Sequence, residues 1–242
     1  MSFEHRSRWC FFVNKFYALA VFGIALLPVG ALAASIDIST TTLTLSPGHT
    51  SGVVRVTNHR PRPDLVSVHV FAWDQVDGVQ HLTPTDDIIG LPPLFTVAPE
   101  AIQTIRIGMR GALDNAKERS YRVVIEEIVP KDLPSNEMMS VNLKLDFPVF
   151  VAPASPKLDL AWSTEKADAT HVRLTAKNVG NMHVKIKTLR LSDGTTNGKS
   201  AEIPGDPVTI LAGESHSWVV AASAAFKHVD ALTDAGAMKA DV

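Results

Sequence analysis

Apolar and polar residues alternate with a period of two through most of the chain, and turn residues close each run. Such a period places alternate side chains on opposite faces of a β-strand, whereas a helix needs a period near 3.6. The pattern therefore predicts an all-β protein. The expected strands are Ile36–Leu45, Val53–Thr57, Val66–Val70, Ile102–Met109, Tyr121–Val129, Met138–Val151, Leu158–Trp162, Val172–Ala176, Val184–Leu191, Ala201–Leu211 and Trp218–Ala221. The last stretch, Phe226–Val242, is rich in alanine, and we expect a short helix or a frayed end there.

The longest alternation runs from Met138 to Val151. Its apolar positions are Met139, Val141, Leu143, Leu145, Phe147, Val149 and Val151, with Asn142, Lys144 and Asp146 between them. At about 3.3 Å per residue this run spans roughly 45 Å, which is more than a small β-sandwich needs from one strand.

Two prolines divide the chain into two modules. Pro153 and Pro156 enclose two small residues and fix φ twice, which is typical of a short stiff link between domains. Val54–Asn58 in the first module is echoed by Val172–Asn178 in the second. With about seven strands expected in each module, the pattern predicts two immunoglobulin-like β-sandwiches in tandem, residues 34–152 and 157–242, joined by a linker at 153–156.

The first 33 residues have the features of a secretory signal peptide. Arg6, Arg8 and Lys15 make a basic start, Tyr17–Leu32 is apolar, and Ala31–Ala33 fits a cleavage site. We expect the exported chain to begin at Ala34. No later segment is apolar for long enough to span a bilayer, so we expect no membrane insertion after cleavage.

Charge and cysteine content exclude several classes of protein. Removing residues 1–33 leaves 20 Lys and Arg against 24 Asp and Glu, a net charge of about −4, which argues against a nucleic-acid or polybasic membrane-surface binder. The single cysteine, Cys10, lies in the signal peptide. A disulfide scaffold, a cysteine nucleophile and a thiolate metal site are therefore excluded from the exported chain.

No constellation of catalytic residues emerges. The histidines are scattered singly, which argues against a metal site. Gly213–Ser217 lacks the second glycine of a nucleophile elbow, and we interpret it as a hairpin. The carboxylate pairs Asp86–Asp87 and Glu126–Glu127 are adjacent on strands and so point to opposite faces. We expect no enzyme activity, no metal and no cofactor.

Several short motifs carry a resemblance to a known family. They are Leu45–Gly48, Val56–Asn58, Phe71–Trp73, Leu82–Asp87, Pro92–Phe95, Gln103–Arg106, Ser120–Arg122 with Glu127, and Phe147–Pro153. The chain resembles the periplasmic pilus assembly chaperones of chaperone–usher systems, the PapD-like superfamily, and most of all their archaic branch, associated with spore-coat-U-like pilins. The resemblance is looser in the second module.

The resemblance implies a function in fimbria assembly. Chaperones of this family bind a pilin that lacks its last strand, complete its fold by lending a strand of their own, and deliver it to an outer-membrane usher. The long alternation is similar to that lending strand, so the residues expected to enter the pilin are Met139, Val141, Leu143 and Leu145. The alternative is that this segment is an ordinary core strand.

The expected basic anchors for the pilin carboxylate are missing. In better-known members an arginine and a lysine hold the C-terminus of the pilin, and the corresponding positions here are Thr42 and Pro148. Arg122 is the first candidate to replace them, with an ion pair to Glu127 as its alternative role. Lys144 and Arg106 are weaker candidates.

The resemblance also implies a link between the two domains. Glu127 matches a glutamate that helps to fix the interdomain angle through an arginine, whose position here is Ala152. We therefore expect Glu127, Pro153 and Pro156 to set that angle.

Three hypotheses follow for the function. The first is a periplasmic chaperone whose partners are pilin subunits and an usher. The second is a structural pilus or spore-coat subunit, which would polymerise by itself after purification. The third is a carbohydrate-binding or hydrolytic β-sandwich, which would bind a ligand without any pilin.

Overall fold

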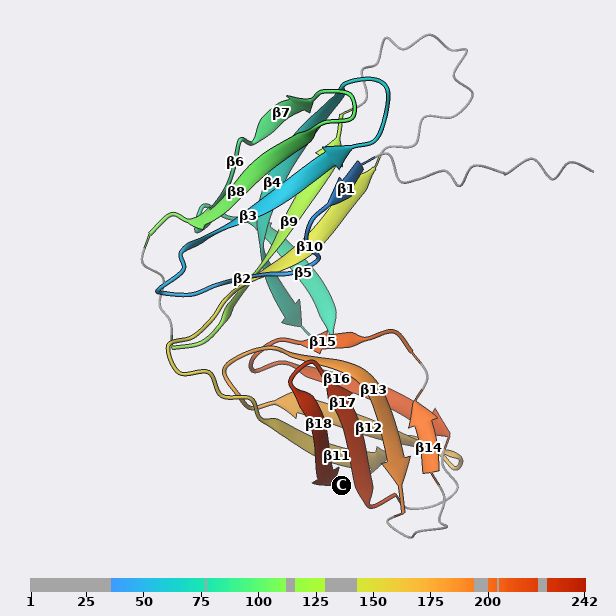
Figure 1. Ribbon diagram of the computed structural model, residues 1–242. Helices are drawn as coiled ribbons and strands as arrows, with labels where there is room; N and C mark the ends of the chain where they lie inside the picture. The colour runs from blue at the N-terminus through green and yellow to red at the C-terminus, as the bar shows by residue number, and fades with distance from the viewer. Residues whose placement is uncertain are drawn as a thin grey trace, which may run out of the picture. The chain divides into compact units, whose positions relative to one another are not determined.

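The computed structural model describes residues 36–76, 78–111, 116–128, 143–193, 200–203, 205–221 and 226–242. These residues belong to one compact unit, Ala34–Val242, and they form strands and turns without a helix among them (Figure 1). The prediction of an all-β protein with two β-sandwiches is confirmed. The predicted signal peptide, residues 1–33, lies outside the described residues.

Two sheets form the first sandwich. One sheet has the order β1-β3-β8-β6, with β1 (Ile36–Ile38), β3 (Ser51–Asn58), β8 (Ile102–Met109) and β6 (Ile88–Leu91). The other has the order β2-β10-β9-β4-β5, with β2 (Leu43–Leu45), β10 (Lys144–Val151), β9 (Arg119–Glu127), β4 (Asp64–Val76) and β5 (Val79–Pro84), while β7 (Leu94–Val97) also pairs with β4. The pairing of β2 with β10 is parallel and the other pairings of this sandwich are antiparallel.

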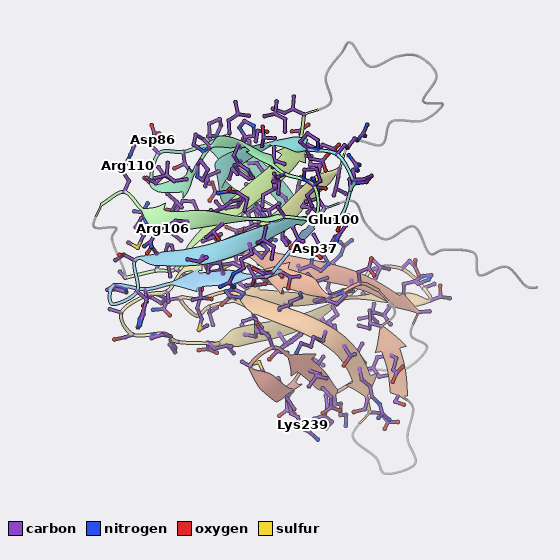
Figure 2. All side chains as sticks on the ribbon, turned by 45° about the horizontal axis from the view of Figure 1, so that its top comes forward. Asp37, Asp86, Glu100, Arg106, Arg110 and Lys239 are labelled. Atoms are coloured by element: carbon purple, nitrogen blue, oxygen red, sulfur yellow. The ribbon has the colours of Figure 1, made fainter. Side chains whose placement is uncertain are left out.

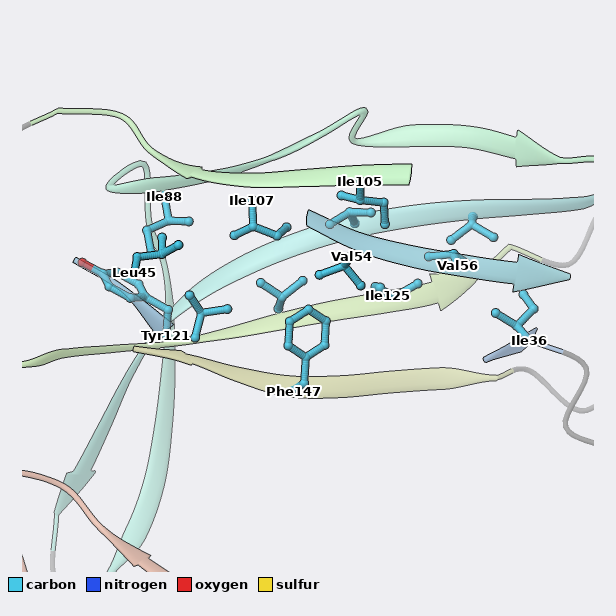
Figure 3. Packing of buried hydrophobic residues seen from close by; sticks show 14 of the residues in the cluster. Ile36, Leu45, Val54, Val56, Ile88, Ile105, Ile107, Tyr121, Ile125 and Phe147 are labelled. Carbon is cyan, nitrogen blue, oxygen red and sulfur yellow. The ribbon is translucent and has the colours of Figure 1, made fainter. Parts of the chain in front are cut away.

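The core of the first sandwich follows from the alternation of its strands. Inward-facing side chains of the two sheets meet in one cluster, in which Val54, Ile105, Tyr121 and Phe147 are almost completely buried (Figure 3). Burial of each such side chain contributes about 1.5–3 kcal/mol of hydrophobic stabilisation. None of the described residues is a cysteine, so this core is stabilised by burial without the disulfides that many small domains use.

The second sandwich has a separate core. One sheet has the order β11-β12-β16, with β11 (Leu160–Lys166), β12 (His171–Asn178) and β16 (Ser215–Ala221). The other has the order β14-β13-β17-β18, with β14 (Ser200–Ile203), β13 (Val184–Ser192), β17 (His228–Thr233) and β18 (Gly236–Asp241), while β15 (Val208–Ile210) pairs with β13. Leu174, Val184, Leu191 and Val229 are fully buried between the two sheets. The sheets of the two sandwiches divide between Val151 and Leu160, the segment that holds the predicted linker.

Two predicted strands are split. The run Ile36–Leu45 forms β1 in one sheet and β2 in the other, because the chain crosses between sheets at residues 39–42. There the Thr40 hydroxyl donates a hydrogen bond to the Thr42 carbonyl at 2.6 Å, a local bond that replaces ladder pairing. The run Ala201–Leu211 forms β14 and β15, which both pair with β13.

Two other expectations are wrong. The segment Phe226–Val242 contains the antiparallel hairpin of β17 and β18, because buried Val229, Ala231 and Thr233 alternate with less buried neighbours. The alanine content of this segment therefore does not produce a helix there. Gly213, at φ 85°, joins β15 and β16, which lie in different sheets, so the segment is a crossover between sheets rather than a hairpin.

Candidate functional site

The described part of the predicted lending strand is β10. It pairs with β9 along its whole length, from Lys144 opposite Glu126 to Val151 opposite Arg119. On its inward face Phe147, Val149 and Val151 are buried, while Leu145 and the preceding Leu143 are only half-buried against the same core. Met139 and Val141 lie outside the described residues.

The outward face of the same sheet holds Arg122. The register places Arg122 directly opposite Pro148 of β10 on one side and Phe71 of β4 on the other, and Phe71 faces Pro84 of β5. Leu43, the residue after Thr42, pairs with Val149. Arg122 thus lies directly opposite Pro148, one of the two positions at which a basic residue was expected, while Thr42 precedes β2, the strand on the other side of β10.

Arg122 is held from three sides. Its Nη1 donates a hydrogen bond to Asp146 Oδ1 at 2.9 Å, and its Nη2 donates one to Gln80 Oε1 at 3.4 Å. The guanidinium carbon lies 4.1 Å from the centre of the Trp73 ring, a cation–π contact. Its side chain is 17% exposed, and its Nε is buried with no hydrogen-bond partner among the described residues.

These contacts correct one expectation. The ion-pair partner of Arg122 is Asp146 and not Glu127, because residues 122 and 127 point to opposite faces of β9. An arginine fork can hold a carboxylate through two parallel hydrogen bonds. Arg122 can therefore bind an incoming carboxylate if its hydrogen bond to Asp146 is broken or if the guanidinium binds both carboxylates at once.

The other two candidate anchors lie elsewhere. Lys144 is exposed at the start of β10, opposite Glu126. Arg106 is exposed on β8 of the other sheet, where its Nη1 donates a hydrogen bond to the Ser51 hydroxyl at 3.3 Å (Figure 2). The structure does not bring either residue next to Arg122.

Glu127 takes part in a buried ion-pair network inside the first sandwich. Arg60 Nη1 donates hydrogen bonds to Glu127 Oε1 and to Asp64 Oδ1, and both carboxylates are at most 5% exposed. Burial by itself lowers the pKa of the Arg60 guanidinium, but the hydrogen bond and charge of Glu127 outweigh it and raise that pKa above its ordinary value. The expected role of Glu127 between the domains is corrected accordingly.

Other residues join the two sandwiches. Gln75 Nε2 donates a hydrogen bond to the Thr209 carbonyl at 2.8 Å, and Gln75 Oε1 accepts one from the Leu211 backbone at 3.0 Å. Leu211 also packs with Trp73 and Phe150 in a small buried cluster. The sequence offered no signal for Gln75, because a polar residue near a strand end is ordinarily exposed.

A cavity of about 420 Å³ is lined by residues of both sandwiches, Trp73, Tyr121 and Leu211 among them. Asp87 lies 3.5 Å from Arg119 and accepts a hydrogen bond from the Tyr121 hydroxyl at 2.9 Å. Burial, followed by this hydrogen bond, raises the pKa of Tyr121 well above its ordinary value. Asp87 and Arg119, two of the charged residues that line the cavity, thus form an ion pair with each other.

Neither a metal-binding cluster nor a membrane-spanning helix is found among the described residues. No three side chains of His, Cys, Asp or Glu gather there in a way that could hold a metal ion. Within the same residues no helix has the length and apolar character needed to cross a membrane.

Similar structures are pilus chaperones. The class 5 fimbriae chaperone CfaA has a TM-score of 0.64 at 15% identity, with 85% of this chain and 98% of that chain covered. The CsuC–CsuE chaperone–tip adhesion subunit complex from archaic Csu pili of Acinetobacter baumannii gives 0.64 at 17% identity, covering 86% and 98%. The Salmonella enterica SafA pilin–SafB chaperone complex gives 0.61 at 17%, covering 88% and 98%. At these identities the likeness establishes the fold.

The sequence itself gives the family. It matches no curated protein sequence. Residues 35–157, however, match the family model described as pili and flagellar-assembly chaperone, PapD N-terminal domain. That match spans the first sandwich and its linker, which carry the motifs Gln103–Arg106 and Phe147–Pro153. The chain belongs to the PapD-type family of pilus-assembly chaperones.

Proposed function

We propose that this protein binds pilin subunits in the periplasm, completes their fold with a strand of its own, and delivers them to an outer-membrane usher. The observation that carries the proposal is the graded burial along β10. Phe147, Val149 and Val151 are sealed in the chaperone's own core, whereas Leu145 and Leu143 on the same face are only half-buried. The strand alternation continues in sequence beyond the part that its own sandwich buries.

Sheet physics explains why such a strand binds a pilin. An immunoglobulin-like subunit without its last strand leaves backbone groups unpaired and an apolar groove open, which promotes aggregation. A lent strand pairs with those backbone groups and fills the groove with alternate side chains. Met139, Val141, Leu143 and Leu145 are the proposed side chains, each contributing about 1.5–3 kcal/mol on full burial. The SafB chaperone, which has the same fold, has been solved bound to its pilin, SafA.

Arg122 is the proposed anchor for the pilin C-terminus. This role is supported by its register position opposite Pro148, by its partly buried setting over Trp73, and by its Nε, which has no hydrogen-bond partner among the described residues. An arginine can replace a missing lysine here because its fork matches a carboxylate with two donors. Asp146 occupies the guanidinium in the free chain, so the incoming carboxylate must compete with it.

The role of the predicted lending strand is tested by placing a charge on the face that is expected to enter the pilin. Val141→Arg should abolish co-purification with a cognate pilin from the periplasm, because a buried unpaired guanidinium is strongly unfavourable. Asn142→Arg is the matched control, since the same charge then lies on the opposite face and the complex should persist. Pilin binding that survives Val141→Arg would overturn the lending-strand assignment.

The anchor is tested separately. Arg122→Ala should weaken the pilin complex at least tenfold, while Lys144→Ala and Arg106→Ala should leave it within about twofold, given that a charge-assisted hydrogen bond contributes about 1.5–3 kcal/mol. Far-ultraviolet circular dichroism checks that each variant is folded. An affinity that is unchanged in Arg122→Ala and reduced in one of the other variants would move the anchor to that residue.

A further inference from the structure

A histidine connects the two sandwiches through carboxylates on both sides. Glu118, just before β9, accepts a hydrogen bond from the His183 backbone N–H at 2.8 Å and lies 2.8 Å from His183 Nδ1 through the same oxygen. On the other side of the ring, His183 Nε2 lies 3.7 Å from Asp234 Oδ2, in the turn between β17 and β18. The Glu118 and His183 side chains are only 2% and 14% exposed.

The ring is also covered on one face. The imidazole stacks on Phe150 of β10, with ring centres 3.6 Å apart and planes 8° from parallel. Nearby hydrogen bonds fix the two segments, since the Glu118 backbone N–H donates to the Asn181 carbonyl at 2.8 Å and the Asn181 side-chain Nδ2 donates to the Ala116 carbonyl at 3.1 Å. His183 therefore belongs to the second sandwich by sequence and is enclosed largely by the first.

The protonation state of the ring decides how many of these contacts it can make. A neutral imidazole carries one N–H, so an Nδ1–H directed at Glu118 leaves a lone pair on Nε2 facing Asp234. An imidazolium carries two N–H donors and a positive charge between two carboxylates, which suits both neighbours. Histidine is the side chain whose charge ordinarily changes between about pH 5 and 8.

Two charged side chains form ion pairs with the ring among the described residues. Glu118 faces it from the first sandwich and Asp234 from the second, and Phe150 contributes an uncharged face. Lys185, close by on β13, meets Asp234 through its backbone N–H at 3.1 Å, and its carbonyl accepts the Asp234 N–H at 3.0 Å. The cation that lies between the two carboxylates is thus the histidine itself, when it is protonated.

We propose that His183 is a pH-dependent clasp that fixes the angle between the two sandwiches when protonated and loosens it when neutral. With the ring protonated, both carboxylates are bound and the junction is rigid. With the ring neutral, the contact with Asp234 is lost and the sandwiches gain freedom about the linker. This clasp belongs to the chain by itself and does not depend on whether Arg122 anchors a partner.

The test measures a distance between the sandwiches. Because Cys10 is the single cysteine, a Cys10→Ser background allows spin labels to be attached at Thr104→Cys on β8 and Lys177→Cys on β12, both exposed. Electron-spin distance distributions are then recorded at pH 5.5 and pH 8.5. We expect a narrow distribution at pH 5.5 and one at least 1.5 times wider at pH 8.5.

Variants at the clasp decide the outcome. His183→Arg should keep the distribution narrow at both pH values, and His183→Gln should remove the difference between them. Asp234→Asn should reduce the difference in width between the two pH values while leaving Glu118 and His183 unchanged. This variant keeps the test informative if a substitution at His183 unfolds the junction. His171→Gln is the matched control, because His171 Nδ1 lies 2.8 Å from Asp168 within one sandwich. Equal widths in the unmodified chain, or a response that survives His183→Gln, would overturn the proposal.

Discussion

The two sandwiches share one structural feature, a corner formed by a buried asparagine at the end of a strand, and they use it differently. Asn58 at the end of β3 and Asn178 at the end of β12 are both completely buried. Each Nδ2 donates to the carbonyl four residues later at 2.8 Å, on Arg62 and on Met182 respectively. Each Nδ2 also reaches the facing sheet, at the carbonyl of Val97 in the first sandwich and of Ile210 in the second.

The loops that leave these corners then diverge. In the first sandwich the residue two positions later is Arg60, whose guanidinium turns inward to Glu127 and Asp64. In the second it is Gly180, and the loop continues to Asn181 and His183, which meet the other sandwich. The same corner therefore stabilises a sandwich in one case and joins two sandwiches in the other. The residues after the corner decide which.

The largest expected loss of stability concerns the loop that follows Asn58, whose Arg60 turns into the first sandwich. Arg60→Met should lower the free energy of unfolding by about 4 kcal/mol, because it leaves Glu127 and Asp64 as buried charges without their cation. Urea unfolding measures the loss. The distance between the sandwiches should stay unchanged, and a change in that distance would contradict a role confined to the first sandwich.

The two corners themselves come next. Asn58→Ala and Asn178→Ala should each lower the free energy of unfolding by about 3 kcal/mol, since each leaves buried backbone groups without partners. Urea unfolding should give similar losses for the two variants. In the distance measurement only Asn178→Ala should widen the distribution, because its loop carries the contacts to Ala116 and Glu118. Equal widening in both variants would remove the distinction between the corners.

A glycine sharpens the same distinction. A Cβ at Gly180 would lie 2.4 Å from the Lys157 carbonyl oxygen and 2.8 Å from the Asp159 nitrogen, both backbone atoms that cannot move aside. Gly180→Ala should therefore destabilise the chain by about 2 kcal/mol in urea unfolding. Gly48→Ala is the control, because nothing lies within 4 Å of its Cβ position. An undisturbed Gly180→Ala variant would mean that this close approach is not required.

The smallest effect is one of pH. Burial lowers the pKa of His216 in the second sandwich, so the folded chain binds fewer protons at this residue than the unfolded chain does. The contribution of His216 to the free energy of unfolding is therefore complete above the ordinary histidine pKa of about 6.5, and it is lost as the pH falls below that value. In the first sandwich the hydrogen bond from His59 lowers the pKa of Asp37. The stability that Asp37 contributes is therefore lost only when the pH falls below about 3.8. Between pH 7 and 5 the melting temperature of the unmodified chain should fall relative to that of His216→Gln, because only the histidine takes up a charge as the pH falls.

Much of the fold could be predicted because alternation is a local property. Ile102–Met109 was predicted with the bounds that β8 has, and the echo of Asn58 and Asn178 pointed to a real equivalence. The echo was misaligned by two residues, since the strands match where each ends at its asparagine. A shift of two keeps every side chain on the same face, so a period of two cannot detect it.

The site was less predictable because its contacts come from distant strands. Asp146 holds Arg122 from the neighbouring strand, 24 positions away, and no spacing in the sequence announces that register. Glu118 was overlooked in favour of Glu127 for the same reason, because both glutamates become buried and only the tertiary fold shows which of them meets the second sandwich. The expectation that Met139 and Val141 enter a pilin stays a prediction.

The parallel pairing of β2 with β10 has a consequence for the order of events during synthesis. Leu43 and Leu45 find their partners only at Val149 and Val151, more than a hundred positions later in the chain. A chain synthesised from its N-terminus presents β2 early and β10 late. The first sandwich therefore cannot close until nearly two thirds of the chain has been made, and until then β2 lacks its partner, whereas β1 can already pair with β3.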